Sequence, residues 1–153
     1  MTELKGIKRL PSSNCLIIRK EGTDKVLTVN SVDKYSPRNT GVFNVYLADE
    51  EEDKSPDNKK RLNQLWYYNA NRRAFLSKKY PSKGLFEGFN SNLCVWKYKG
   101  VKNQLWSYDM NHHIWFNDFS KHALAVEKNE NLITKPMDKD DVSSQWIAEP
   151  CKQ

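Results

Sequence analysis

The chain has no long hydrophobic run. Among its 153 residues, no apolar stretch approaches the ~20 residues that a membrane-spanning helix needs. The first eleven residues include Lys5, Lys8 and Arg9 but lack the apolar core that a signal peptide requires. We therefore expect no membrane span and a cytoplasmic location, with secretion by a non-classical route left open.

Cysteine and histidine are scarce as well. The three cysteines, Cys15, Cys94 and Cys151, are odd in number and show no metal-binding spacing, which fits a reducing compartment. His112 and His113 are adjacent, and no third metal ligand lies at a suitable spacing. The spacing of residues also gives no Ser-His-Asp, Cys-His or paired-carboxylate arrangement. We therefore expect no enzyme activity, no metal site and no cofactor.

The net charge of +6 is unevenly spread along the chain. Residues 61–100 contain eight Lys or Arg residues against Glu87 alone, whereas residues 41–60 contain six acids against three lysines. A basic sector of this size can attract polyanions such as sulfated glycans or nucleic acid. A solvated, lysine-rich surface explains the same composition equally well.

A tetrapeptide recurs along the chain. Asn-Gln-Leu-Trp stands at 63–66 and again at 103–106. Trp146, within Ser-Ser-Gln-Trp at 143–146, follows Trp106 at the same distance that separates Trp106 from Trp66. Because tryptophan is scarce, a fixed period of this kind indicates a repeat architecture.

Each repeat contains four short apolar or alternating runs of strand length. They lie at 14–20, 25–30, 41–47 and 63–68, then at 74–79, 84–89, 93–99 and 104–109, and finally at 113–118, 123–128, 132–137 and 144–149. No segment shows a helical stripe with caps, and we expect the polar insertion at 48–62 to be a surface loop. The pattern predicts an all-β single domain over 1–153. It predicts a β-trefoil with pseudo-threefold symmetry, built from three repeats of four short strands at about 14–73, 74–112 and 113–150.

The motifs resemble those of the ricin B-type (QxW) β-trefoil lectins. Gln-Leu-Trp at 64–66 and 104–106 matches the Gln-x-Trp signature, Ser-Gln-Trp at 144–146 is a degenerate copy, and the resemblance covers residues 14–150. It implies a non-catalytic, carbohydrate-binding lectin for galactose- or N-acetylgalactosamine-like glycans. In a trefoil the first and last strands are neighbours, so Cys15 and Cys151 can form a disulfide under oxidising conditions.

The resemblance also implies a sugar site within one repeat. An aromatic ring on the third strand stacks on the sugar, and the Asn-Gln pair binds hydroxyls. An acidic residue after the second strand accepts a hydrogen bond from another hydroxyl. In the second repeat these roles fall to Trp96, Asn103 and Gln104, with Glu87 as the nearest carboxylate.

In the first repeat the corresponding residues are Tyr46, Asn63 and Gln64, with Asp33 close to the acidic position. The third repeat offers no ring at the platform position, so we expect it to be silent. We thus expect sugar binding in the second repeat, and the first repeat is the weaker candidate.

We expect glycans or glycoproteins as partners, and nucleic acid is not favoured. Two other hypotheses remain. One is a protein-interaction or scaffolding trefoil without sugar binding, and the other is polyanion binding through the basic 61–100 sector. A protein partner and a homodimer are both compatible with the sequence.

Overall fold

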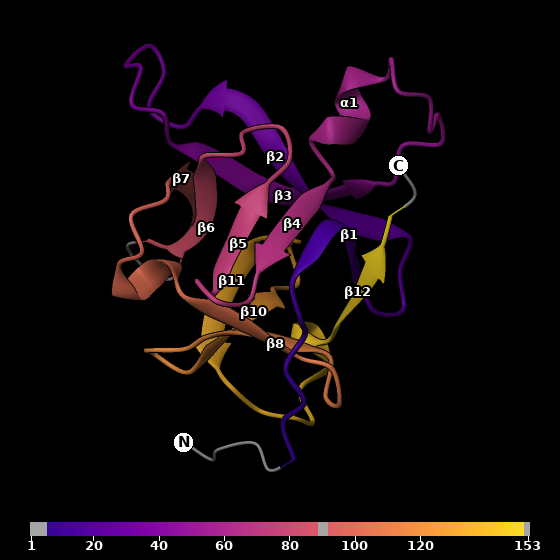
Figure 1. Cartoon of the computed structure of the whole chain (residues 1–153), viewed down its shortest axis with the longest axis vertical. Coiled ribbons are helices and arrows are strands. Elements are labelled where there is room, and N and C mark those ends of the chain that lie inside the picture. Colours follow the sequence, from indigo (N-terminus) through magenta and orange to yellow (C-terminus); the bar gives the residue numbers. More distant parts are fainter. Residues whose placement is uncertain (1–5, 89–91, 152–153) are drawn as a thin grey trace.

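The structure is a computed structural model that describes residues 6–88 and 92–151, and within them the chain forms twelve β-strands (Figure 1). The first six are β1 (Ser13–Lys20), β2 (Lys25–Asp33), β3 (Phe43–Asp49), β4 (Trp66–Asn69), β5 (Ala74–Ser77) and β6 (Lys83–Glu87). The others are β7 (Leu93–Lys97), β8 (Trp106–Asp109), β9 (Ile114–Asn117), β10 (His122–Val126), β11 (Leu132–Pro136) and β12 (Trp146–Pro150). The all-β prediction is confirmed, and each predicted strand overlaps an observed one. Phe89, the end of one predicted strand, lies outside the described residues.

The strands form a barrel and three hairpins. β1 pairs with β12 and β4, β4 pairs with β5, and β8 pairs with β9. Two backbone hydrogen bonds close the remaining gaps: Trp106 N to Arg73 O at 2.9 Å beside β5, and Trp146 N to His113 O at 2.7 Å beside β9. The pairs β2–β3, β6–β7 and β10–β11 are antiparallel hairpins joined to this barrel.

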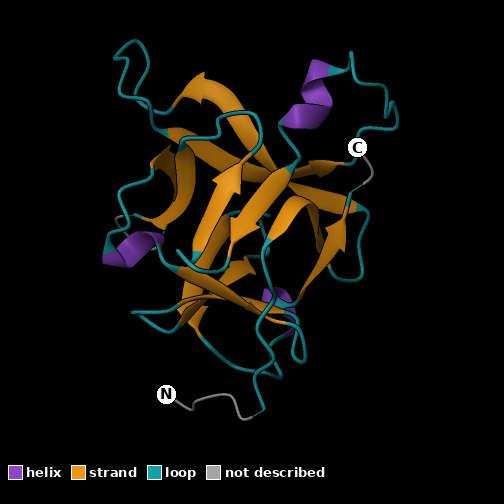
Figure 2. Ribbon diagram, viewed as in Figure 1, coloured by secondary structure: helices purple, strands orange, loops and turns teal. Residues whose placement is uncertain are grey.

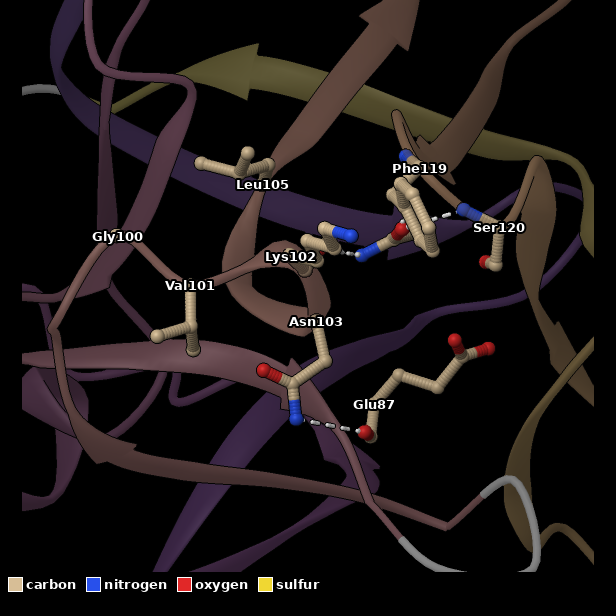
Figure 3. A pocket seen from close by; sticks show the side chains of 9 residues that line it. Glu87, Gly100, Val101, Lys102, Asn103, Leu105, Phe119 and Ser120 are labelled. Carbon is tan, nitrogen blue, oxygen red and sulfur yellow. Dashed lines mark hydrogen bonds between the residues drawn. The ribbon is translucent and has the colours of Figure 1, made fainter.

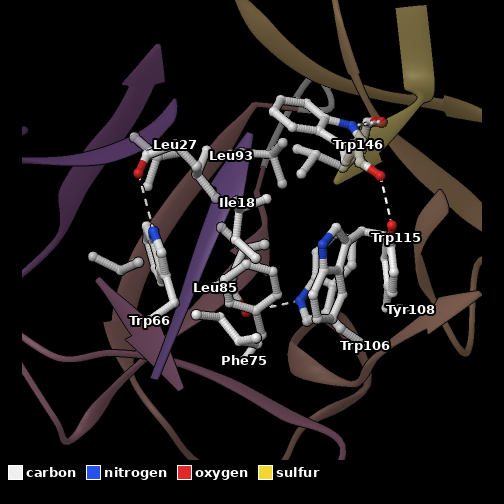
Figure 4. Packing of buried hydrophobic residues seen from close by; sticks show 14 of the residues in the cluster. Ile18, Leu27, Trp66, Phe75, Leu85, Leu93, Trp106, Tyr108, Trp115 and Trp146 are labelled. Atoms are coloured by element: carbon white, nitrogen blue, oxygen red, sulfur yellow. Dashed lines mark hydrogen bonds between the residues drawn. The ribbon is translucent and has the colours of Figure 1, made fainter. Parts of the chain in front are cut away.

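The three tryptophans that define the period lie fully buried in the core (Figure 4). Each indole N–H donates to a leucine carbonyl on the second strand of its own repeat. The pairs are Trp66 with Leu27 at 3.0 Å, Trp106 with Leu85 at 2.9 Å, and Trp146 with Leu124 at 2.9 Å. Burial of one indole contributes about 4–6 kcal/mol as an upper bound. These tryptophans are therefore structural residues.

Short helical turns precede the three tryptophan strands, as Figure 2 shows. They are α1 (Lys59–Leu62), η2 (Lys102–Gln104) and η3 (Val142–Ser144). The predicted strands that began at 63, 104 and 144 were therefore too long at their start. The insertion at 48–62 was expected to be a loop and instead ends in α1, where the Asn58 side chain caps the helix by accepting a bond from the Lys60 amide at 3.2 Å.

A disulfide joins the first strand of the barrel to the segment after the last strand. Pairing of β1 with β12 brings Cys15 and Cys151 to a Cα–Cα distance of 5.4 Å, and they form a disulfide. Disulfides persist mainly in oxidising compartments, so this bond weighs against the cytoplasmic location expected from the sequence. Cys94 is free, and its burial raises the pKa of its thiol to about 11. No helix among the described residues is long and apolar enough to cross a membrane.

Candidate functional site

One carboxylate occupies a position that the other two repeats fill with valine. Glu87 follows Leu85 by two residues on β6 and pairs with Leu93, and the equivalent positions are Val29 and Val126. Its Oε2 is buried and makes no hydrogen bond among the described residues. His122 Nδ1 lies 3.4 Å from this oxygen. A largely buried carboxylate costs more free energy than the valine of the other two hairpins, and the contact with His122 offsets part of this cost.

The η2 turn places Asn103 beside Glu87. The Asn103 side-chain Nδ2 donates to the Glu87 carbonyl oxygen at 3.2 Å. Among the described residues this is the only hydrogen bond of that side chain, and Asn103 is exposed. The structure therefore brings together two of the residues that the sequence predicted for a sugar site.

Glu87 and Asn103 form one wall of a pocket of ≈ 620 Å³, which we call the Phe119 pocket. Phe119 lies in the turn after β9 and is 62% exposed. Figure 3 shows the Glu87 carboxylate pointing to the side of this pocket where Ser120 lies. An exposed ring, a carboxylate and an amide thus meet in one open hollow.

A second hollow adjoins the Phe119 pocket. This Tyr35 pocket has a volume of ≈ 580 Å³ and is also lined by Glu87 and Asn103. The loop between β2 and β3 contributes Lys34 and Tyr35 to it, and Tyr35 is 51% exposed. The two pockets therefore share these two lining residues and adjoin each other.

Asp33 holds the loop that carries Tyr35. Its carboxylate accepts bonds from the Tyr35 amide at 2.9 Å, the Thr40 hydroxyl at 2.8 Å and the Gly41 amide at 2.7 Å. Partial desolvation acts to raise the pKa of Asp33, but these hydrogen bonds outweigh it and hold the pKa below its ordinary value. Asp33, predicted as a sugar contact in the first repeat, is engaged in organising this loop.

The two predicted glutamines lie inside the protein. Gln104 is 1% exposed, and its amide accepts from the Lys99 N–H at 2.8 Å and donates to the Lys97 carbonyl at 2.9 Å. Gln64 is 4% exposed, and its amide accepts from the Glu51 N–H and donates to the Asp49 carbonyl at 2.8 Å each. Because both ends of each amide are occupied by backbone, the structure does not bring these groups to the pocket surface.

Trp96 packs beside the Tyr35 pocket without lining it. It is on the same face of β7 as Cys94, its ring centroid is 6.2 Å from that of Phe86, and Lys99 Nζ lies 4.5 Å from its ring centroid. Trp96 is partly exposed, but it lines neither the Phe119 pocket nor the Tyr35 pocket. Among the hollows described for residues 6–88 and 92–151, none is lined by both the predicted platform ring Trp96 and the predicted amide Asn103.

The first-repeat residues are also separated. The hairpin register pairs Tyr46 with Thr28, and the residue equivalent to Trp96 is Ala48. Tyr46 lines a third hollow, described below, whereas the Asn63 side-chain oxygen accepts a bond from the Ser31 hydroxyl at 3.2 Å. The structure therefore does not assemble a first-repeat site from Tyr46 and Asn63.

Phe119 and Tyr35 were not among the predicted site residues. Both lie in turns outside the repeat that supplies Asn103, so the motif within that repeat does not indicate them. The available signal is a large aromatic residue in an otherwise polar turn, as in Asn117–Lys121. Among the described residues, no group of three His, Cys, Asp or Glu side chains could hold a metal ion.

No protein-family model and no curated protein matches the sequence. Solved structures do match. The Vibrio vulnificus hemolysin/cytolysin β-trefoil lectin with bound N-acetyl-D-lactosamine aligns with a TM-score of 0.72 and 11% identity, over 93% of this chain and 97% of that one. A non-toxic homologue of type II RIPs from Momordica charantia, in complex with α-methyl-D-galactoside, gives 0.69 and 12%, over 90% and 48%.

GalNAc-T7 with UDP, GalNAc and Mn2+ gives a TM-score of 0.64 and 16% identity, over 92% of this chain. The chain spans only 22% of the length of that protein. At such identities the likeness concerns the fold. The resemblance expected from the repeated Asn-Gln-Leu-Trp motif holds at that level: the chain has the β-trefoil fold of the ricin B-type lectins.

Proposed function

We propose that this protein is a non-catalytic lectin that binds a galactose- or N-acetylgalactosamine-like residue in the Phe119 pocket. The observation that carries the proposal is the Glu87 carboxylate, which stands where the other two hairpins have valine. It lines one pocket together with Asn103 and an exposed ring. A pyranose presents one C–H face that packs on a ring and hydroxyl groups that amides and carboxylates bind. In this arrangement Phe119 is the platform, and Asn103 and Glu87 accept hydrogen bonds from sugar hydroxyls.

The neighbouring structures support this class of ligand. The Vibrio lectin holds N-acetyl-D-lactosamine, and the Momordica protein holds a methyl galactoside. We infer that this chain uses the same surface chemistry at a different position, because its exposed ring comes from the turn after β9. Glycans or glycoproteins are the partners that follow from this proposal.

We also propose that the single domain consists of three units related by a pseudo-threefold axis, at about 14–73, 74–112 and 113–150. The three indole bonds support this, since their donors are evenly spaced along the chain. The units are unequal in the proposed function. In the third unit, Val142 and Ser143 line a hollow that has no aromatic residue in its wall, so no ring is available to stack on a sugar.

The basic 61–100 sector is a weaker basis for function, because several of its cations contact the protein itself. Lys99 lies over Trp96, Arg72 lies 4.7 Å from the Tyr98 ring centroid, and the Lys83 ammonium donates to the Gly41 carbonyl at 2.7 Å. Binding through free cations would weaken steeply with salt. Binding of a neutral sugar through the Phe119 pocket is expected to be nearly independent of salt.

Calorimetric titration with galactose and N-acetylgalactosamine tests the proposal. A ligand of ~12 heavy atoms gains roughly −4 kcal/mol, so we expect a Kd in the millimolar range. Phe119→Ala and Asn103→Ala should each raise the Kd at least tenfold. Trp96→Ala is the control and should leave it unchanged. Loss of binding in Trp96→Ala, with full binding in Phe119→Ala, would return the platform role to Trp96 and contradict the proposal.

A further inference from the structure

The Phe119 pocket and the Tyr35 pocket continue into a third hollow. This Tyr46 pocket has a volume of ≈ 400 Å³ and lies where the hairpins β2–β3, β6–β7 and β10–β11 meet. Lys34 and Asn92 line both the Tyr35 pocket and the Tyr46 pocket, just as Glu87 and Asn103 line both of the first two. Each hollow therefore shares lining residues with the next one, and we call the three together the extended groove.

Each hollow of the extended groove contains one exposed aromatic ring. Phe119 is 62% exposed, Tyr35 is 51% exposed and Tyr46 is 44% exposed. A folded protein gains by burying such rings, so three of them along one groove indicate a ligand that covers them. Lys102 lies 4.3 Å from the Phe119 ring centroid and Lys34 lies 5.7 Å from that of Tyr35, which helps to fix the two rings in place.

Side-chain amides lie between and beside the rings. Asn103 stands between the first two hollows and Asn92 between the last two. The Tyr46 pocket adds further asparagines, at Asn30, Asn44 and Asn131. Amides both donate and accept hydrogen bonds, which suits ligands with many hydroxyl groups and no net charge.

We propose that the extended groove binds a linear oligosaccharide of at least three pyranose units, one against each ring. This inference rests on the proposed lectin function and deepens it by assigning a chain-length requirement. The terminal unit occupies the Phe119 pocket, and the following units lie against Tyr35 and Tyr46. Asp33 is a positioning residue here, because its three hydrogen bonds hold the loop that presents Tyr35.

The groove explains how a protein with weak individual subsites reaches useful affinity. Three linked contacts add their free energies without repeating the full entropic cost of association. An alternating arrangement of rings and amides is expected for a chain of pyranoses. A globular protein partner would instead require a larger and more continuous apolar surface.

The test is a chain-length series, measured by calorimetry on the whole protein. The probes are galactose, N-acetyllactosamine, and the linear dimer and trimer of N-acetyllactosamine. We expect the Kd to fall at least thirtyfold from N-acetyllactosamine to its dimer. Repeated epitopes in the dimer and trimer account for only about a two- to threefold gain, so a drop of this size requires additional subsites.

Variants separate the subsites. Tyr35→Ala and Tyr46→Ala should each weaken binding of the dimer at least fivefold and leave galactose binding unchanged. Met110→Ala, at an exposed apolar residue that lines none of the three hollows, is the control. Thermal unfolding of each variant verifies that it is folded.

The outcomes are distinct. Equal affinity for N-acetyllactosamine and its oligomers, with Asn103→Ala abolishing both, would overturn the extended groove and leave the lectin function standing. Absence of binding to every probe would overturn the lectin function and this inference with it. A gain with chain length that survives both tyrosine variants would also contradict the assignment of these rings.

Discussion

At the scale of single residues, Glu87 is the clearest departure from a purely structural design. Its position is filled by Val29 and Val126 in the other two hairpins, where an apolar side chain faces the interior. A largely buried carboxylate whose Oε2 contacts only His122 Nδ1 among the described residues, at 3.4 Å, is costly here, and residues of this kind concentrate at binding sites. The exposed Asn103 amide beside it supplies the complementary group.

We therefore predict that Glu87→Val stabilises the protein and abolishes sugar binding. Valine removes the burial cost of the carboxylate together with its contact with the part-exposed His122, so we expect the free energy of unfolding to rise by up to about 1 kcal/mol, which corresponds to ~3 °C in Tm for a domain of this size. Thermal unfolding and sugar titration on the same sample measure both effects. Glu127→Val in the hairpin of β10 and β11 is the matched control and should change neither. Retained binding in Glu87→Val would show that this carboxylate has no role in recognition.

Sequence reasoning named two of the three residues of the proposed site. Asn103 and Glu87 could be predicted because the motif places an amide just before Trp106 and only one acid lies within residues 61–100. Phe119 could not, because it reaches the pocket from the turn after β9, which lies beyond the motif and in the next repeat. Contacts between repeats depend on how the barrel closes, and the motif within one repeat holds no information about that.

At the scale of elements, the glutamine of the motif anchors the turn before each tryptophan strand in the first two repeats. Gln104 bonds the backbone at Lys97 and Lys99, and so ties η2 to the segment that follows β7. The third repeat has Ser144 in this position, and its hydroxyl bonds only the Asp141 carbonyl at 3.0 Å. The glutamine and the tryptophan of the repeated tetrapeptide thus stabilise the fold and do not themselves contact the proposed sugar site.

We predict that Gln104→Ala lowers stability without changing affinity. Two buried backbone groups would lose their partners, at a cost of about 1–3 kcal/mol each, reduced where water enters. Urea unfolding and galactose titration well below the Tm measure the two quantities. Gln145→Ala is the control, because that side chain makes a single bond near the surface, to the Lys139 carbonyl at 3.2 Å. A loss of galactose affinity in folded Gln104→Ala would restore this residue to the sugar site.

Strand positions could be predicted from the sequence, but the register between repeats could not. Short apolar runs, aligned on the tryptophan spacing, located all twelve strands, and in the structure each of the three indoles reaches a carbonyl on the second strand of its repeat. Tyr46 was matched to Trp96, whereas the ladders make Ala48 its equivalent. The insertion at 48–62 changes the distance from the third strand to the motif, so counting along the chain misplaces the match.

At the scale of the whole molecule, the core is held by bonds that cross between repeats. The buried Tyr68 hydroxyl donates to the Trp106 carbonyl at 2.6 Å, and the Tyr108 hydroxyl donates to the Trp146 carbonyl at 2.5 Å. The equivalent position in the third repeat is Ala148, which has no hydroxyl to make such a bond. Ala148 lies on β12, and the chain directly after β12 is linked to β1 by the disulfide between Cys15 and Cys151. A crosslink over so long a loop stabilises a fold by up to about 5 kcal/mol in the chain-entropy model.

These tyrosines predict a loss of stability at high pH. Burial raises the pKa of Tyr68 to about 12, and burial likewise raises the pKa of Tyr108 above its ordinary value of 10.0. The unfolded chain releases these protons first, so the stabilisation is complete below pH 10 and is lost as the pH rises from 10 toward 12.

The expected slope is about 1.4 kcal/mol per pH unit for each tyrosine within that window. Urea unfolding between pH 8 and pH 11 measures it, with Tyr68→Phe as the comparison because it removes one ionisation and keeps the ring. Identical pH dependence in the wild type and Tyr68→Phe would contradict the assignment to Tyr68.

The central claim is that a sugar binds where Asn103, Glu87 and Phe119 meet. The most direct measurement is a ¹H–¹⁵N NMR titration of the whole protein with galactose. We predict saturable shifts of the Asn103 side-chain amide and of the backbone amides of Phe119 and Ser120, with the Trp96 indole N–H unchanged. Shifts at the Trp96 indole, or no shift at Asn103 at saturating galactose, would contradict the account.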